Sequence, residues 1–413
     1  MPASICRREL RSTCAKCGTP KASLRSAKAR GRLPNWACRA SPKKLVKYRK
    51  TWQSFSMSNF VVKPAKAAAR PAQSPSTTPT SYDVAQKAGV SQSAVSRCFR
   101  PGSSISPKTR SRVIAAANEL GYFPNAMASG LITKRSNLVA VLISNLTNLY
   151  YPEVLAEITR RLSDRGIRVL LFALQAESDV DAMLDQVWRY RVDGAIVAAR
   201  LSPAQLLDFT RHRVPVVLYN RFGEGAPVPS VCCDSMGGER QLVERLIAAG
   251  HEVFGIISGP DDSYVSQERV RGAEHWLRES GREAVLVKGA FDYESGDAGL
   301  RALMEMTDRK LDALICANDL MAIGAIDCAR THFGIAVPQD LSVVGFDGVA
   351  PAEWASYRLS TVRQPVRRMT EAAVSMLIER INDPDLPPEV RTFAGAFIEG
   401  TSARFDARAD SPA

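Results

Sequence analysis

Short apolar runs alternate with amphipathic segments from residue 137 almost to the end of this 413-residue chain. The runs are as short as buried strands, and the segments between them have the apolar spacing of helices. We predict strands at Leu138–Ile143, Val169–Ala173, Ala195–Ala198, Val216–Tyr219, Val253–Ile257, Val285–Val287, Ala313–Cys316 and Ser342–Phe346. The predicted helices between them include Glu153–Arg165, Val180–Tyr190, Glu239–Ala249 and Glu268–Ser280. This alternation predicts an α/β fold with two parallel sheets, divided near residue 235 and covered by helices on both faces.

Two short helices joined by a tight turn are predicted at residues 80–97, in the sequence TSYDVAQKAGVSQSAVSR. Thr80 can cap the first helix, with Asp83 in its electropositive first turn, and Gly89 permits the bend. The outward side chains of the second helix are predicted to be Ser91, Gln92, Ser93, Ser96 and Arg97. Short hydrogen-bonding groups and a cation near a helix N-terminus suit the major groove of DNA. A small helical hairpin of another function has the same spacing.

A third helix is predicted from residue 107 to residue 120. Ser106 can cap it, Pro107 occupies its first position, and Gly121 ends it. Its predicted apolar stripe consists of Val113, Ile114, Ala117 and Leu120. With the preceding pair, this helix completes an all-α N-terminal unit.

These motifs, in their order, closely resemble the lactose-repressor (LacI/GalR) family of bacterial transcription regulators. The matching segments are YDVAQKAGVSQSAVSR, SPKTRSRVIAAANELGYFPN and a short hinge ending at Leu131, and the resemblance extends from Thr80 to the end of the chain. It implies a helix-turn-helix DNA-binding headpiece and a two-lobed domain like the periplasmic binding proteins. We expect an extension at 1–79, the headpiece at 80–123, a hinge and linker at 124–136, the two-lobed effector-binding and dimerisation domain at 137–405 and a polar tail at 406–413. The resemblance also implies that the hinge enters the minor groove through Asn125, Ala128 and Leu131, with Leu131 wedged between base pairs.

Polar and aromatic residues follow several predicted strands, where ligands of open α/β sheets bind. The segments VRGAEHW, CANDLMAIGA and SVVGFDG resemble the ligand-domain motifs of the same family. By that resemblance Arg269 and Asp347 hold polar groups of an effector, Tyr150, Tyr151 and Phe291 stack on it, and Asn220 and Asn318 hydrogen-bond it. The family often has a second acid after this aspartate, where Gly348 stands here. Without the resemblance, a surface arginine, a helix-capping aspartate and core tyrosines explain the same residues.

The net charge of +13 is unevenly distributed along the chain. Residues 1–80 carry 18 basic residues and one acid, residues 81–136 have a net charge of +6, and residues 137–413 have a net charge of −10. A basic end joined to an acidic body suits the binding of phosphates at one end. Residues 1–79 are rich in Lys, Arg, Ala, Ser and Pro, so we predict a basic disordered extension. It is either a non-specific DNA-binding tail or translated upstream sequence from a misplaced start codon, with Met57 as an internal candidate.

The motifs of other protein classes are missing from the sequence. His212, His251, His275 and His332 match no catalytic triad or metal spacing, and no phosphate-binding glycine loop follows the first predicted strand. Cys14 and Cys17 form a Cys-x-x-Cys pair that a zinc knuckle could use, but no second pair follows. We therefore expect no enzyme, no cofactor and no metal. No apolar run approaches the roughly 20 residues of a membrane span, and we expect a cytoplasmic, nucleoid-associated protein that binds no membrane.

Together these features predict an effector-controlled transcription regulator, most simply a repressor. A homodimer would read a pseudo-palindromic operator, because a two-fold dimer reads a two-fold site. The effector is predicted to be a small polar metabolite, a sugar or a sugar derivative. The end of the chain is short and polar, which favours a dimer over a tetramer. A periplasmic sugar-binding protein shares the two-lobed fold but would carry an export signal and no helix-turn-helix.

Overall fold

The computed structural model describes residues 78–124 and 135–405, apart from residues 101, 145, 175–178, 224–226 and 308–309. The predicted extension up to residue 77, the hinge residues Asn125, Ala128 and Leu131, and the tail at 406–413 lie outside the described residues. Within these two described stretches, no helix is long and apolar enough to cross a membrane.

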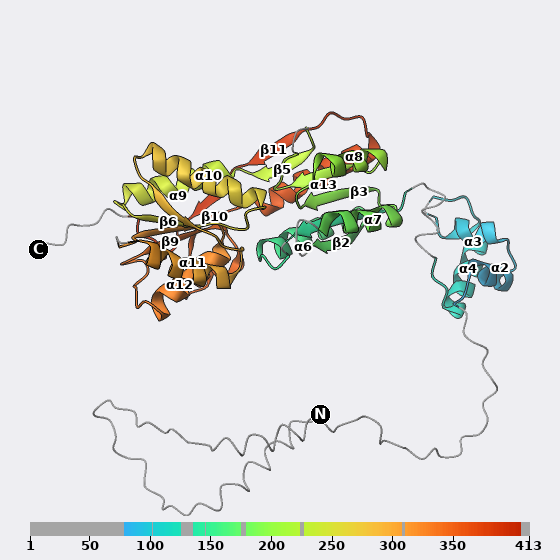
Figure 1. The fold of residues 1–413 in the computed structure, drawn as a ribbon. Helices are drawn as coiled ribbons and strands as arrows, with labels where there is room; N and C mark the ends of the chain where they lie inside the picture. Colours follow the sequence, from blue (N-terminus) through green and yellow to red (C-terminus); the bar gives the residue numbers. More distant parts are fainter. Residues whose placement is uncertain are drawn as a thin grey trace, which may run out of the picture. The chain divides into compact units, whose positions relative to one another are not determined.

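Three helices, α2 (Ser81–Ala88), α3 (Gln92–Cys98) and α4 (Pro107–Leu120), form the N-terminal headpiece (Figure 1). The Thr80 side chain accepts a hydrogen bond from the Asp83 amide, and the Thr80 amide donates to the Asp83 carboxylate, so the predicted N-terminus of α2 is confirmed. Gly89 adopts the left-handed conformation that the turn needs, with φ of 58°. These caps fix the helix ends, so the three helices can present a common apolar face.

The headpiece core is small and consists of valines and alanines from all three helices, with Cys98. On α4 the buried residues are Val113, Ala116 and Ala117. The prediction that Ile114 belongs to the buried stripe is wrong, because this side chain is 40% exposed. Ala116, which was not in the predicted stripe, belongs to the headpiece core instead.

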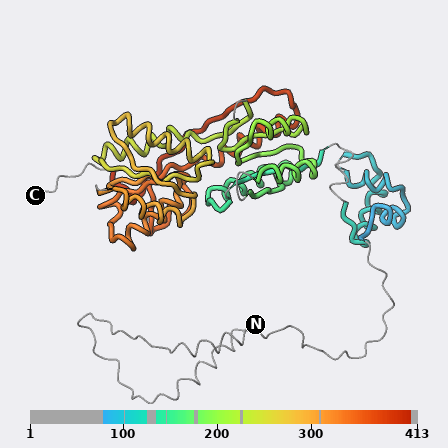
Figure 2. The backbone as a smooth tube through the Cα atoms, in the orientation of Figure 1, coloured from blue at the N-terminus to red at the C-terminus, as the bar shows by residue number. Residues whose placement is uncertain are grey.

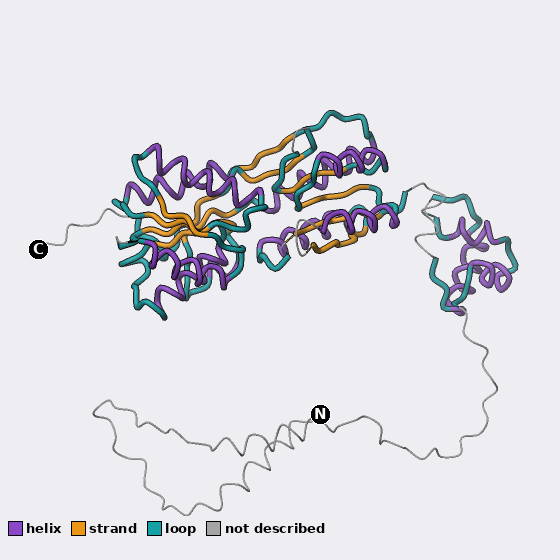
Figure 3. Tube along the Cα trace, in the orientation of Figure 1, coloured by secondary structure: helices purple, strands orange, loops and turns teal. Residues whose placement is uncertain are grey.

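Each of two six-stranded sheets forms the centre of one lobe, with helices on both faces (Figure 3). The first sheet has the order β11-β5-β4-β3-β1-β2, and the second has the order β12-β10-β9-β8-β6-β7. Every paired neighbour is parallel except β10 and β12, which are antiparallel. The strands are β1 (Leu138–Ser144), β2 (Arg168–Leu174), β3 (Gly194–Ala198), β4 (Val216–Tyr219), β5 (Ser230–Cys233), β6 (Phe254–Ile257), β7 (Ala284–Val287), β8 (Ala313–Cys316), β9 (Ser342–Asp347), β10 (Ser360–Arg363), β11 (Val390–Phe393) and β12 (Ala396–Ile398). The fold class predicted from the alternation is confirmed.

The helices of the body are α6 (Tyr150–Ser163), α7 (Val180–Tyr190), α8 (Pro203–Arg211), α9 (Ser235–Ala248), α10 (Tyr264–Glu279), α11 (Tyr293–Met306), α12 (Asp319–Thr331) and α13 (Val366–Asn382), with a 3-10 turn, η4 (Ala350–Glu353). The central strands β1, β3, β6, β8 and β9 are buried along almost their whole length, as strands covered on both faces must be. The burial of these apolar strands therefore fixes the positions of the polar residues that follow them.

The chain passes from one lobe to the other three times. It leaves the first sheet after β5, returns from β10 to α13 and β11, and crosses again to β12. In the backbone trace the red C-terminal part accordingly runs through both lobes (Figure 2). The predicted division near residue 235 matches the first crossing, and the two later crossings were not predicted.

Candidate functional site

The exposed face of α3 carries the side chains that were predicted to contact DNA. Gln92, Ser93 and Arg97 are exposed and Ser96 is half-buried, while Val95 and Cys98 anchor the opposite face of the helix. The Ser91 side chain accepts a hydrogen bond from the Ala94 amide, which fixes the start of α3. This helix therefore presents polar groups and one guanidinium from a rigid support.

A second candidate site lies at the carboxyl ends of the strands, where residues from both lobes enclose a cavity of about 20 Å³. Its walls are formed by Asn148, Tyr150, Tyr151, Asn220, Arg221, Ser263, Val265, Arg269, Phe291, Asp347 and Gln364. A cavity of this size has room for about one water molecule. In this conformation the two lobes are closed over the site.

A continuous chain of hydrogen bonds crosses this pocket from one lobe to the other. The hydroxyl groups of Tyr219 and Tyr150 are 3.0 Å apart, and the Asn220 side chain donates to the Tyr150 hydroxyl at 3.4 Å and to the side-chain Oε1 of Gln364 at 2.8 Å. Gln364 then donates to the Asp347 carboxylate at 2.7 Å. The Gln364 side chain, on a segment that crosses between the lobes, thus links the amide of one sheet to the acid of the other.

Arg269 and Asp347 form a buried ion pair at the second-lobe end of this chain, 2.7 Å apart. Arg269 also donates to the Ala317 carbonyl at 2.6 Å, and its guanidinium lies over the ring of Phe346 at 4.0 Å. Burial raises the pKa of Asp347, while Arg269, Gln364 and Asn148 act in the opposite direction. Arg269 Nε and Asp347 Oδ2 make no hydrogen bond of normal geometry, so both groups retain capacity for a polar partner.

Three residues that line the pocket have positive φ although none is glycine. The angles are 51° at Asn220, 65° at Phe291 and 121° at Asp347. Such conformations cost of order 1–3 kcal/mol each and cluster at ligand sites, where the surrounding structure holds them. Here they turn the three side chains into the space between the lobes.

Six of the seven predicted effector residues line the cavity, and Asn318 does not. The Asn318 side chain accepts from the Met321 amide at 3.0 Å, which caps α12, and donates to the Phe291 carbonyl at 3.0 Å. Tyr150 and Tyr151 lie in the first turn of α6 rather than in a loop. Asn148 and Arg221 also line the cavity; they stand among the polar residues that follow predicted strands, but no effector contact was predicted for them. Ser263, Val265 and Gln364 were not predicted at all.

Two further acids are fully buried in the second lobe. Burial raises the pKa of Glu239 to about 8, against the opposing effect of Arg269. Burial and the neighbouring Asp347 raise the pKa of Asp319 to about 8, although Asp319 accepts hydrogen bonds from Thr361 and from the Val349 amide. Burial therefore favours the protonated form of both carboxyl groups. Among the described residues, no group of three His, Cys, Asp or Glu side chains could hold a metal ion.

A helix-turn-helix headpiece attached to a two-lobed α/β domain with a polar pocket defines a ligand-responsive DNA-binding regulator. Residues 80–125 match the family model of bacterial regulatory proteins of the lacI family, and residues 243–403 match that of the periplasmic binding protein-like domain. The regulator AscG of Escherichia coli is 31% identical over 335 residues, which cover 78% of this chain and 98% of AscG. The regulator CelR of Thermobifida fusca is 33% identical over 324 residues, covering 75% of this chain and 94% of CelR.

Two solved structures of transcription regulators are also similar to this chain. A CelR–cellobiose complex matches with a TM-score of 0.60 at 30% identity, covering 79% of this chain and 100% of the other. The Lac repressor dimer bound to operator and an anti-inducer matches with a TM-score of 0.71 at 26% identity, covering 79% and 99%. The chain belongs to the LacI family of bacterial transcription regulators, a family of DNA-binding proteins and not of enzymes.

Proposed function

We propose that this protein is a repressor that binds a pseudo-palindromic operator as a homodimer and responds to a sugar or a sugar-like effector. The observation that carries the proposal is the hydrogen-bonded pocket that joins the two lobes, on a chain whose headpiece has a polar, solvent-exposed recognition helix. The relative solved with cellobiose and the relative solved as a dimer on operator DNA support both parts. We further propose that the protein works in the cytoplasm at the nucleoid, where its DNA lies.

In the headpiece, α3 would lie in the major groove. Gln92 and Ser93 are placed in its first turn, where side chains reach base edges, and Arg97 is placed one turn further along. Ser91 and Ser96 would contact the flanking backbone. For the hinge, Asn125, Ala128 and Leu131 keep the minor-groove role that the family resemblance implies.

In the pocket, Arg269 and Asp347 would hold effector hydroxyl groups, since a guanidinium donates and a carboxylate accepts. Tyr150, Tyr151 and Phe291 would supply the apolar faces that sugars stack on, and Asn220 would add a hydrogen bond. Asn318 would act through Phe291, whose carbonyl it holds. Because the closed cavity has room for about one water, entry of a sugar requires the lobes to separate and the bond between Asn220 and Gln364 to open. That movement would link effector binding to the headpieces.

The test compares Arg269→Ala with Arg271→Ala, an exposed arginine on the same helix. A thermal-shift screen with cellobiose, other sugars and sugar acids first identifies a ligand, and calorimetry then measures its affinity. Losing a charged hydrogen-bond donor costs about 1.5–3 kcal/mol, so we expect at least a tenfold loss for Arg269→Ala and none for Arg271→Ala. Operator binding without ligand should persist in both variants. Wild-type ligand affinity in Arg269→Ala would contradict the proposed site.

A further inference from the structure

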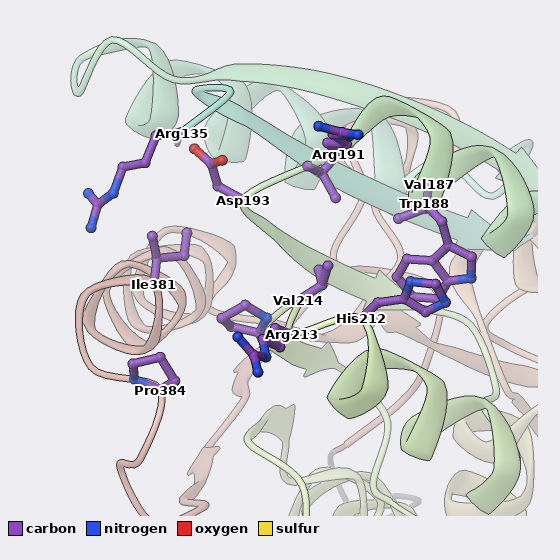
Figure 4. A pocket seen from close by; sticks show the side chains of 12 residues that line it. Arg135, Val187, Trp188, Arg191, Asp193, His212, Arg213, Val214, Ile381 and Pro384 are labelled. Carbon is purple, nitrogen blue, oxygen red and sulfur yellow. The ribbon is translucent and has the colours of Figure 1, made fainter. Parts of the chain in front are cut away.

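A groove of about 480 Å³ lies in the first lobe at the amino ends of β3 and β4, at the edge of the sheet opposite the effector pocket. Figure 4 shows Trp188 and His212 on one side of it and Arg135 on the other. Trp188 and His212 are stacked, with ring centroids 4.3 Å apart and planes 7° from parallel. The groove is thus a formed feature with a rigid aromatic wall, and the effector site does not use it.

Three arginines and one acid line this groove: Arg135, Arg191, Arg213 and Asp193. Asp193 is already engaged, because its carboxylate accepts hydrogen bonds from the Ser136 amide, the Ser136 hydroxyl and the Asn137 amide at 2.7–2.9 Å. Arg191 and Arg213 are exposed, and neither forms an ion pair with any of the described side chains. With three arginines against one carboxylate, the lining of the groove has a net positive charge.

The backbone at both arginines is held in a conformation that disfavours a side chain. Arg191 follows α7 with φ of 48°, and Arg213 follows the end of α8 with φ of 56°. At the corresponding turns after α6, α9, α10 and α12 the chain has Gly166, Gly250, Gly281 and Gly334, all with positive φ. Only the two turns that line the groove carry arginine instead, among the helix-to-strand turns that the structure describes. Non-glycine residues in such conformations cluster at functional sites, where the surrounding structure holds them.

The groove also lies where the chain leaves the body towards the headpiece. Asp193 clamps Ser136 and Asn137, and Arg135 at the groove donates to Asn382 at 2.9 Å. Between Pro124, at the end of the described headpiece, and Arg135 the chain can span at most roughly 40 Å. A headpiece bound to DNA therefore tethers this groove within that distance of Pro124, in the neighbourhood of a duplex whose phosphates are the densest anions there.

We propose that Arg191 and Arg213 bind phosphate groups of the operator DNA backbone, so that the body of the protein contributes to DNA affinity alongside the headpiece. This inference rests on the proposed function, because a DNA-bound headpiece is what brings the phosphates within reach. The contribution is electrostatic and independent of base sequence.

The test uses the full chain with Arg191→Gly and Arg213→Gly combined. Glycine removes each charge and suits the positive φ, so the double variant should melt no lower than wild type. Arg358→Gly is the matched control, since Arg358 is an exposed arginine with φ of 41° in the second lobe. The probe is a duplex that carries the operator recovered from a randomised-sequence selection and extends beyond it on both sides. Its affinity is measured between about 50 and 200 mM salt.

Each lost phosphate contact should reduce the slope of log K against log salt by about 0.9, or about 1.8 per subunit for the pair. The proposed homodimer loses four contacts, so its slope should fall by about 3.6. Over this salt range its loss of affinity then becomes about 150-fold smaller for the double variant, with wild-type behaviour in Arg358→Gly. An unchanged slope overturns the proposal. If the slope is unchanged but inorganic phosphate stabilises wild type and not the double variant at equal ionic strength, the groove binds a free phosphate compound and DNA is excluded as its ligand. Preference for operator over scrambled DNA should be the same in all variants, and its absence in wild type would refute the proposed function instead.

Discussion

Replacing Glu239 by glutamine should stabilise the protein, and the gain should grow with pH. Glu239 is 1% exposed, neither oxygen of its carboxyl group has a hydrogen-bond partner in the described structure, and its pKa is raised from 4.5 to about 8. The folded protein therefore keeps a proton that the unfolded chain releases above about pH 4.5. Because the folded state binds more protons, this residue's contribution to stability falls as pH rises from about 4.5 to about 8.

The magnitude follows from the two pKa values. Each pKa unit corresponds to about 1.36 kcal/mol, so the cost of keeping Glu239 protonated is about 2 kcal/mol at pH 6 and about 4–5 kcal/mol at pH 8. Glutamine has nearly the same shape and no charge, so Glu239→Gln should gain up to these amounts. Asp319 behaves in the same way with a pKa of about 8. Burial also raises the pKa of Asp347, so the dependence of unfolding free energy on pH should be reduced in Glu239→Gln, not abolished.

The assay is urea unfolding at pH 6 and pH 8, followed by tryptophan fluorescence. Trp276 is a suitable reporter, because it lies on α10 and donates to the Met236 carbonyl of α9, the helix that carries Glu239. The exposed Glu279→Gln on α10 is the control and should leave the pH dependence unchanged. If Glu239→Gln is no more stable than wild type at pH 8, the carboxyl group is ionised in the folded protein and the reasoning from burial is wrong.

Three further predictions concern the headpiece and the strained pocket residue. Replacing Gln92 and Ser93 together by alanine should change the preferred operator in a randomised selection while leaving salt-dependent, non-specific binding nearly intact; an unchanged preference would contradict their assignment. Ser91→Ala removes the cap on the Ala94 amide and should lower headpiece stability by about 1 kcal/mol, measured by thermal unfolding, so an unchanged melting temperature would show that the cap is unimportant. Asn220 has φ of 51°, so Asn220→Gly should melt higher than Asn220→Ala although both lose the same hydrogen bonds, and equal melting would disprove backbone strain there.

The strongly apolar strands could be predicted from the sequence, because a short run of apolar residues between helical segments is typical of a strand buried on both faces. All eight predicted strands form, and β4 and β8 have the predicted bounds. The strands β5, β10 and β11 were missed because each has only four residues and mixes polar with apolar side chains, and β12 was missed because it has only three residues. A short strand of that kind is formed by its neighbours in the sheet, and this information lies far away in the sequence.

For the candidate site too, some residues could be predicted from the sequence and others could not. Arg269 and Asp347 stand in recognisable motifs, and the structure brings them into contact. Gln364 was missed because it follows β10, and nothing local shows that this segment returns to the first lobe. Asn318 was expected in the pocket because it follows β8, but its side chain is used by the α12 cap and the Phe291 carbonyl. Position at a strand end identifies the neighbourhood of a ligand, and hydrogen-bond geometry decides which side chains remain available to it.

The late return of the chain to the first lobe has a consequence for its synthesis on the ribosome. One face of the first sheet is covered by α13, whose Leu377 lies close enough to Gly194 of β3 that a side chain there would meet it at 2.8 Å. Strands β1 to β5 are complete at Cys233, but α13 begins only at Val366. At 5–20 residues per second, that interval lasts on the order of ten seconds. During it the part of the apolar face that α13 covers has no partner, although α6 already packs beside it. A nascent chain stalled between these points should therefore be a substrate for chaperones that bind exposed apolar surface.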